Sequence, residues 1–290
     1  MANNLVDALF RTEALQLAPA EEVFWYTSGT VGPYYINTHF LFGGRAPAEA
    51  LLQLIDDEKG RGASFLSQLE EALEAQYAAE PIYAEVIDCL VEEVGNKTGG
   101  DFDWISAGER RDWFFAPLVG RRLGKPVLYI YKDLKVILAG EDQATPVEDL
   151  SGGRSVHIAD LVTEASSYLR GWLPALRERG GQMGWAVNVV DRGQGGSEIL
   201  AGEGVEASYL LRVDESLFAQ LHAAGRIDAN QQELLGAYYR DPHGAMKAFL
   251  QERPHFIRRA LASEDRRLAE RARLLTEQNP YDLDPALFEG

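Results

Sequence analysis

Short apolar segments alternate with longer amphipathic segments in the second third of the chain. The apolar segments predict strands because they are short and are bounded by polar or Gly-containing stretches, and they lie at 103–106, 126–131, 155–159, 184–190 and 206–213. The segments between them at 110–124 and 166–180 have helical length and spacing. Strands and helices alternating at this spacing are typical of βαβ units, so we expect a mostly parallel sheet with helices on both faces.

The two flanks of this region lack the strand pattern. Residues 1–20 carry leucines at helical spacing, and 46–95 indicates two or three helices with breaks near 59–62 and at Pro81. Residues 215–277 are helical in pattern throughout.

These patterns predict two domains within the 290 residues. The first, 1–213, has an α/β core at 100–213 and an N-terminal hood with a helical insertion at 1–99. The second is a helical C-terminal extension at 214–290. A Rossmann-like α/β fold with a helical extension is therefore expected.

The charge and the composition exclude several classes of protein. The 28 basic and 45 acidic residues give a net charge of -17, which argues against nucleic-acid binding, since that requires a basic face. Cys89 is the only cysteine, which excludes an intrachain disulfide and a zinc site of cysteine ligands. The first fifteen residues lack the pattern of a signal peptide, and no apolar stretch approaches the roughly 20 residues of a membrane span. We therefore expect a soluble cytoplasmic protein without membrane contact.

The segment from Ser155 to Ser167 has the design of a phosphate site. An apolar strand ends in Asp160, and Thr163 and two serines precede the next predicted helix. Backbone N–H groups and hydroxyls at a helix N-terminus favour an anion, and an acid at the strand end can bind ribose hydroxyls. The alternative is a serine that only caps the helix and an Asp in a turn, and the residues alone leave the two readings about even.

The same segment, VHIADLVTEASS, resembles the phosphoribosyl pyrophosphate (PRPP) motif of type I phosphoribosyltransferases. Asp160 matches the second of two adjacent acids in that motif, while Ala159 stands where the first acid is expected. Glu164 brings a negative charge near the 5′-phosphate, and the Cβ atoms of the pair after it restrict the loop to non-glycine conformations. The resemblance implies that PRPP is bound by Asp160, Thr163, Glu164, Ala165, Ser166 and Ser167.

Two further segments resemble the orotate phosphoribosyltransferases of that family. In TSGTVGPYYIN (27–37), Tyr34 and Tyr35 match an aromatic pair beside the orotate ring, although the residues also suit a turn followed by a core strand. In VNVVDRGQGGSEIL (187–200), Arg192 matches the residue that meets the orotate carboxylate, whereas an Asp–Arg pair bridging strand and loop is the alternative. The resemblance implies a base site of Tyr34, Tyr35, Thr163 and Arg192.

The segment YKDLKVI (131–137) resembles the start of the family's mobile catalytic loop. Lys132 and Lys135 have the separation of its two lysines, whereas Tyr131 and Ile137 replace its arginine and histidine. A lysine there neutralises pyrophosphate charge in the transition state, so the resemblance implies catalytic roles for Lys135, Lys132 and Asp160. Two solvated lysines on a hairpin are the alternative.

The segment 105–120 occupies the place of the family's pyrophosphate loop. By position, Arg110 and Arg111 are expected to contact the diphosphate of PRPP. The aromatic run 113–115 and His157 are expected to be buried.

These resemblances imply a type I phosphoribosyltransferase fold and an orotate phosphoribosyltransferase-like activity. PRPP and orotate or a related base are then the small-molecule substrates, Mg²⁺ is brought by PRPP with no site formed by protein alone, and the protein is a homodimer. Two alternatives stay open. One is a protein that binds PRPP or a nucleotide in a regulatory or partner-binding role without turnover, and the other is an enzyme acting on another base.

Overall fold

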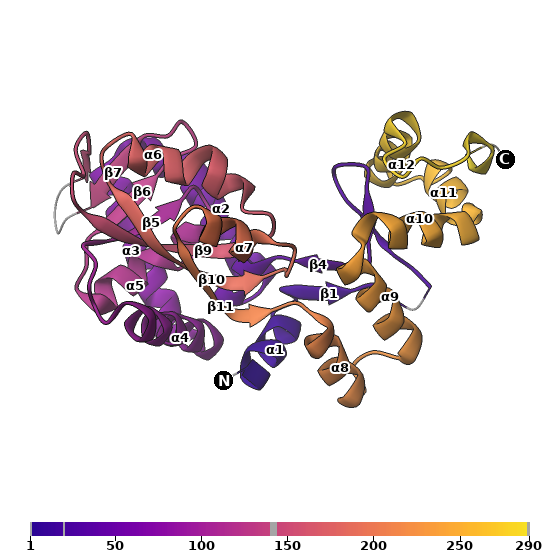
Figure 1. Cartoon of the computed structure of the whole chain (residues 1–290), viewed down its shortest axis with the longest axis horizontal. Coiled ribbons are helices and arrows are strands. Elements are labelled where there is room, and N and C mark those ends of the chain that lie inside the picture. The colour runs from indigo at the N-terminus through magenta and orange to yellow at the C-terminus, as the bar shows by residue number, and fades with distance from the viewer. Residues whose placement is uncertain (1, 20, 140–143, 289–290) are drawn as a thin grey trace. The chain divides into compact units, whose positions relative to one another are not determined.

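The computed structural model describes residues 2–19, 21–139 and 144–288 (Figure 1). Its contacts divide the chain into two compact units, Met1–Leu15 with Asn37–Arg212, and Gln16–Ile36 with Val213–Gly290. The sequence pattern predicts a domain boundary at residue 213, and this boundary stays a prediction. The compact units are divided differently, because the segment 16–36 groups with the residues after 213.

The first unit is built on a seven-stranded sheet of order β11-β10-β9-β5-β6-β7-β8. The pairs from β11 to β6 are parallel, and β7 and β8 form an antiparallel edge. This confirms the predicted mostly parallel sheet. The strands are β5 (Trp104–Gly108), β6 (Val127–Ile130), β7 (Val136–Ala139), β8 (Ala144–Pro146), β9 (Arg154–Val162), β10 (Gln182–Asp191) and β11 (Glu206–Arg212).

Apart from α7, the helices of the first unit lie within the segments that the sequence pattern predicts to be helical, and the first of them is shorter than predicted. The N-terminal helix ends at Arg11 instead of reaching residue 20, because Glu13 takes a left-handed conformation (φ 58) and a short strand follows. The helices are α1 (Ala2–Arg11), α2 (Arg45–Glu58), α3 (Ala63–Ala79), α4 (Pro81–Thr98), α5 (Ala116–Leu123), α6 (Leu173–Arg177) and α7 (Gly196–Gly202). Short turns of 3-10 or π type are η1 (Thr38–Phe42), η2 (Lys59–Arg61), η3 (Asp112–Phe114) and η4 (Tyr168–Trp172).

Alternate residues of β6 show that helices cover both faces of the sheet. Leu128 and Ile130 belong to the buried apolar cluster that contains residues of α6 and α7. Tyr129 points to the other face, where its ring meets Trp113 edge-on at 5.5 Å, just before α5. Because successive side chains of a strand point to opposite faces, this alternation buries β6 on both sides.

The strand order reverses between β5 and β9. From β5 the chain passes through α5 to β6 on one side, whereas β9, β10 and β11 follow one another on the other side. In open α/β sheets, ligands bind in the crevice at the carboxyl ends of strands where the order reverses. The residues after Gly108 and around Asp160 therefore lie at the position where this architecture places a site.

The second unit packs short strands against the C-terminal helices. Trp25 stacks on Phe256 with ring centroids 5.5 Å apart, and Arg271 donates a hydrogen bond to the Trp25 carbonyl. These contacts explain why 16–36 groups with the C-terminal region. The elements are β1 (Leu15–Leu17), β2 (Phe24–Trp25), β3 (Val31–Gly32), β4 (Tyr34–Ile36), α8 (Glu215–Ala223), α9 (Ala229–Arg240), α10 (Pro242–Glu252), α11 (Pro254–Leu261), α12 (Arg266–Gln278) and η5 (Pro285–Leu287).

Within the three ranges that the structure describes, no helix is both long enough and apolar enough to cross a bilayer.

Candidate functional site

A cleft of about 550 Å³ lies in the first unit. Its lining comes from three places: 109–112 after β5, Lys132 after β6, and 160–168 with Trp172 at and beyond the end of β9. Since β5, β6 and β9 are neighbouring parallel strands, their carboxyl ends meet at one edge of the sheet. The structure thus brings together the predicted pyrophosphate loop, one predicted lysine and the predicted PRPP motif.

The motif loop presents free backbone donors to this cleft. Among the described residues, the N–H groups of Thr163, Glu164 and Ala165 have no hydrogen-bond acceptor, and the exposed Ser166 and Ser167 begin the next helical turn. The Glu164 side chain is also exposed. This is the arrangement of donors that an anion requires.

Ala165 corrects one sequence expectation about this loop. Its φ is 53, in the left-handed region, and the residue is buried at 3% exposure. A Cβ was expected to restrict the loop to non-glycine conformations, yet the surrounding packing holds an alanine in a conformation that glycine adopts freely. Such a conformation costs an alanine about 1–2 kcal/mol.

Two aspartates form the floor of the cleft. Asp112 accepts hydrogen bonds from the backbone N–H of Asp160 at 3.0 Å and of Gly108 at 2.9 Å. Burial raises the pKa of Asp160, and the neighbouring Asp112 carboxyl raises it further. Burial likewise raises the pKa of Asp112, against the hydrogen bonds that it accepts. Because two adjacent carboxyl groups resist double ionisation, the pair retains a proton more readily than an isolated aspartate would.

A buried aromatic cluster supports this floor. His157 is fully buried, as expected from the sequence, and stacks on Trp172 with ring centroids 4.4 Å apart. Its Nδ1 lies 3.0 Å from the Ser106 hydroxyl, and its Nε2 lies 3.5 Å from Asp112. Burial lowers the pKa of His157 to about 3, so the imidazole is neutral and its contact with Asp112 is not an ion pair.

The basic side chains of the cleft differ in their partners. Arg110 forms an ion pair with Asp56 of α2, whereas Arg111 and Lys132 are exposed at the cleft. Glu109 accepts a hydrogen bond from the backbone N–H of Lys132 at 3.0 Å, which fixes the position of that turn beside the pyrophosphate loop. Arg111 and Lys132 are therefore the two cations best placed to meet an anionic ligand.

The second predicted lysine, Lys135, lies on the same turn but does not line the cleft. The Tyr131 N–H donates to the Lys135 carbonyl at 2.9 Å, so 131–135 is a tight connection between the antiparallel strands β6 and β7. Ile137 is buried in β7, and burial raises the pKa of Tyr131 to about 12. The chain after the predicted start of the mobile loop enters β7 and then β8, which pair antiparallel, and residues 140–143 lie outside the described part of the chain.

Arg192 lies beside the motif loop. Its backbone N–H donates to the Val162 carbonyl at 2.9 Å, and Gly196 approaches Thr163 so closely that a Cβ there would lie 2.5 Å from the Thr163 carbonyl. Asp191 accepts bonds from the Gly193 N–H and the Ser197 hydroxyl and so shapes this loop. The arrangement keeps Arg192 next to the segment predicted to bind PRPP.

Tyr34 and Tyr35, the other predicted base contacts, belong to the second unit. Tyr34 is buried against Tyr238, and the Tyr35 hydroxyl donates to the Trp25 carbonyl at 2.6 Å. Their role at a base site stays a prediction.

Sequence reasoning assigned no site role to six residues that line the cleft, namely Glu109, Asp112, Leu161, Val162, Tyr168 and Trp172. Asp112 carried one usable signal, because it follows two arginines directly after a strand, where polar side chains gather at a sheet edge. Tyr168 and Trp172 gave none, since aromatic residues at helical spacing are usually core residues.

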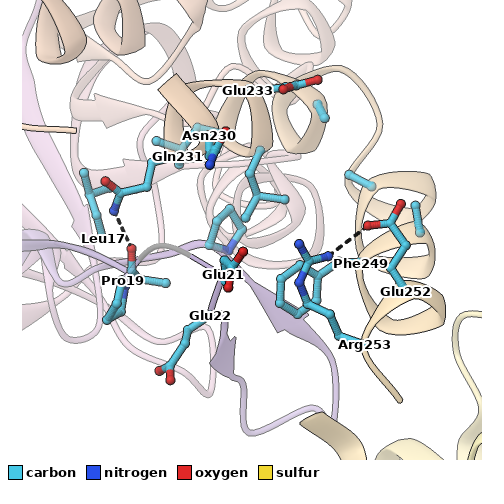
Figure 2. A pocket seen from close by; sticks show the side chains of 17 residues that line it. Leu17, Pro19, Glu21, Glu22, Asn230, Gln231, Glu233, Phe249, Glu252 and Arg253 are labelled. Atoms are coloured by element: carbon cyan, nitrogen blue, oxygen red, sulfur yellow. Dashed lines mark hydrogen bonds and ion pairs between the residues drawn. The ribbon is translucent and has the colours of Figure 1, made fainter. Parts of the chain in front are cut away.

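A second hollow of about 430 Å³ lies within the second unit (Figure 2). Its rim carries Glu21, Glu22, Glu233 and Glu252, and Glu252 pairs with Arg253 at 2.9 Å. Carboxylates repel a phosphate, so this hollow is unsuited to the ligand that the first cleft can bind.

Gly108→Ala is expected to destabilise the first unit by about 1–3 kcal/mol, because the added Cβ would overlap the Trp172 indole. Denaturant unfolding measures the change. Gly202→Ala is the matched control, since a Cβ at that glycine of α7 meets no atom within 4 Å and is expected to leave stability equal or slightly higher. Equal stability of the wild type and Gly108→Ala would contradict the packing of Trp172.

His157→Gln is expected to reduce the acid sensitivity of the fold. The pKa of His157 lies near 3 in the folded protein and near 6.5 when unfolded, so the unfolded state binds the extra proton as pH falls below about 6.5. The stability of the wild type relative to the variant should therefore fall by up to about 1.4 kcal/mol per pH unit between pH 6 and 4. A flat difference between wild type and His157→Gln over this pH range would refute the buried neutral imidazole.

Known proteins resemble this chain in part of its sequence and in its fold. No family model matches the chain. Over 128 residues, it is 35% identical to the orotate phosphoribosyltransferase of Aeropyrum pernix. That match covers 43% of this chain and 65% of the relative, so the chain spans just under two thirds of the curated relative's length.

Two solved structures show the same fold at low sequence identity. The UMP synthase of Leishmania donovani matches with a TM-score of 0.53 and 18% identity, over 86% of this chain and 42% of that one. The orotate phosphoribosyltransferase of Francisella tularensis matches with a TM-score of 0.51 and 12% identity, over 85% of this chain and 97% of that one.

The mostly parallel sheet, the cleft at its switch point and these neighbours define a type I phosphoribosyltransferase fold. Over the 128 matched residues, the sequence is similar to that of an orotate phosphoribosyltransferase.

Proposed function

We propose that the chain transfers a phosphoribosyl group from PRPP to orotate or a related base. In this reaction a bond forms between N1 of orotate and the anomeric carbon of PRPP, and the bond from that carbon to the pyrophosphate oxygen breaks. Pyrophosphate leaves with the electron pair, and the proton released from N1 passes to pyrophosphate or to solvent. The convergence of 109–112, Lys132 and 160–168 on one cleft carries the proposal. These segments supply cations, a ribose acceptor and free backbone donors within a single hollow.

Different residues would bind different parts of PRPP and of the base. The 5′-phosphate would bind the N–H groups of 163–165 and the hydroxyls of Ser166 and Ser167, and the ribose hydroxyls would bind Asp160. Arg111 and Lys132 would neutralise the diphosphate as it leaves, with Arg110 behind them. Arg192 would meet the carboxylate of the base, for which a guanidinium offers two parallel donors.

Mg²⁺ would enter with the substrate. Among the described residues no group of three or more His, Cys, Asp or Glu side chains is placed to hold a metal ion. In this proposal the phosphate and ribose oxygens of PRPP would carry the ion, since Mg²⁺ prefers oxygen ligands. Such an ion would neutralise part of the diphosphate charge. We also propose that the protein is a homodimer, that it is cytoplasmic and that it has no nucleic-acid partner.

The direct test is pyrophosphate release from PRPP and orotate with Mg²⁺, with PRPP binding followed by calorimetry. Turnover that requires both substrates would support the proposed activity. Absence of both turnover and PRPP binding would refute it. Lys132→Ala should lower turnover more than Lys135→Ala, because Lys132 alone of the two lines the cleft.

The second candidate function is PRPP binding without turnover. Two side chains favour this function. The buried Ile137 and the neutral Tyr131 occupy the positions at which the family's catalytic loop has a histidine and an arginine. PRPP binding without pyrophosphate release from orotate or from a panel of other bases would favour this function. Release with another base alone would instead identify an enzyme of different specificity.

A further inference from the structure

We propose that Asp112 is a positioning residue of the ribose site, supplying the second carboxyl beside Asp160 in place of the acid missing at Ala159. The inference rests on the proposed function, because it assigns a role at the same cleft. It concerns a residue outside the PRPP motif, contributed by η3 after β5.

The contacts of Asp112 join the two strand ends at the switch point. One carboxyl oxygen accepts the N–H of Asp160 and the other accepts the N–H of Gly108. The side chain is only 3% exposed, so these bonds are shielded from water. Asp112 therefore fixes the backbone that carries the Asp160 carboxyl and the backbone that begins the pyrophosphate loop.

Ala159 explains why the carboxyl comes from another element. It is fully buried in the apolar cluster with Val162, Tyr168 and Leu173, where an ionised side chain would lack a partner. Asp112 approaches from η3 instead, directly beside Asp160. The loss of the first motif acid from β9 is thereby offset by an acid from a different loop.

The surroundings of the pair suit the binding of sugar hydroxyls. Arg111 lies on the cleft side, and the neutral His157 lies 3.5 Å from Asp112 on the buried side. With a proton retained between two carboxyl groups, the pair keeps acceptor oxygens for a diol without presenting two full negative charges to a polyanionic substrate. Asp160 would touch the hydroxyls, and Asp112 would act through Asp160.

Calorimetry with three ligands on the full chain separates positioning from general damage. Asp112→Asn should weaken binding of ribose 5-phosphate and PRPP about tenfold or more and leave binding of inorganic phosphate unchanged, since phosphate uses only the 163–167 donors. The matched control is Asp103→Asn, whose carboxylate accepts the Arg154 N–H at 2.8 Å and joins the beginnings of the same two strands at the opposite edge. This control should bind all three ligands like the wild type.

Two outcomes overturn the inference while leaving the proposed function intact. One is an Asp112→Asn variant that binds ribose 5-phosphate like the wild type, and the other is an equal loss of affinity for all three ligands. A wild type that binds neither PRPP nor ribose 5-phosphate overturns both. If Asp112→Asn does not fold, assigned carboxyl ¹³C signals of the wild type decide. Ribose 5-phosphate should shift Asp112 and Asp160 where phosphate does not, and an unmoved Asp112 signal refutes the inference.

Discussion

Asp160→Asn is expected to weaken PRPP binding and to lower pyrophosphate release about 100-fold. Asparagine keeps the shape of the side chain but removes the charge and one acceptor oxygen, and it turns an NH₂ group toward the cleft or toward Asp112. A hydrogen bond to a charged group contributes about 1.5–3 kcal/mol, which is about a 10- to 100-fold change in affinity. The upper end applies because the substitution also changes the side chain that hydrogen-bonds to the buried Asp112 carboxyl. Calorimetry and a pyrophosphate assay measure the two effects.

The same substitution should not lower the stability of the fold. Because burial raises the pKa of Asp160, the folded state disfavours its charge, and a neutral side chain removes that penalty. Activity lost at undiminished stability is therefore the expected signature. The exposed Asp149→Asn is the control and should retain both properties. An Asp160→Asn protein with wild-type PRPP affinity would exclude Asp160 from the ribose site.

Local sequence patterns predicted strands such as β6 and β10 well because these strands are buried on both faces. Such strands are continuous runs of apolar residues, as at 126–131 and 184–190, so their positions can be predicted from the local sequence. The strand predicted at 155–159 was too short, since β9 continues to Val162. Asp160 ends the apolar run, but Leu161 still pairs with Val190 of β10. A polar residue within a strand can therefore make the strand appear to end too early.

The residues that sequence analysis could not assign are joined by long-range contacts. Asp112 meets Asp160 across 48 positions, and nothing near either residue specifies the other. The grouping of 16–36 with the C-terminal helices likewise depends on contacts such as Trp25 with Phe256. Lys132 and Lys135 have the same local pattern, yet only the geometry of the 131–135 turn brings one of them to the cleft. Sequence spacing identifies candidate site residues, and only the folded structure shows which of them reach the cleft.

Trp113→Ala is expected to destabilise the first unit by about 3–5 kcal/mol. The indole is fully buried, lies edge-on to Tyr129 and Tyr131 at 5.5 and 4.9 Å, and packs near Phe65 of α3. Its Nε1 also donates to the Ala107 carbonyl at 3.2 Å. Truncation leaves a large cavity between the helical insertion and the sheet, and this loss is a large fraction of a typical 5–15 kcal/mol stability. Denaturant unfolding and hydrogen exchange of the β5 and β6 amides measure it.

The consequence should extend to the site, because Trp113 follows Asp112 directly and contacts the Tyr131 that begins the Lys132 turn. Under conditions where Trp113→Ala stays folded, its PRPP affinity should therefore fall as well. Trp113→Phe keeps most of the buried area and should lose less in both measurements. Leu169→Ala, at a side chain 38% exposed, should stay within about 0.5 kcal/mol of the wild type. If Trp113→Ala lost stability but bound PRPP normally, the aromatic packing would support the fold without positioning the cleft.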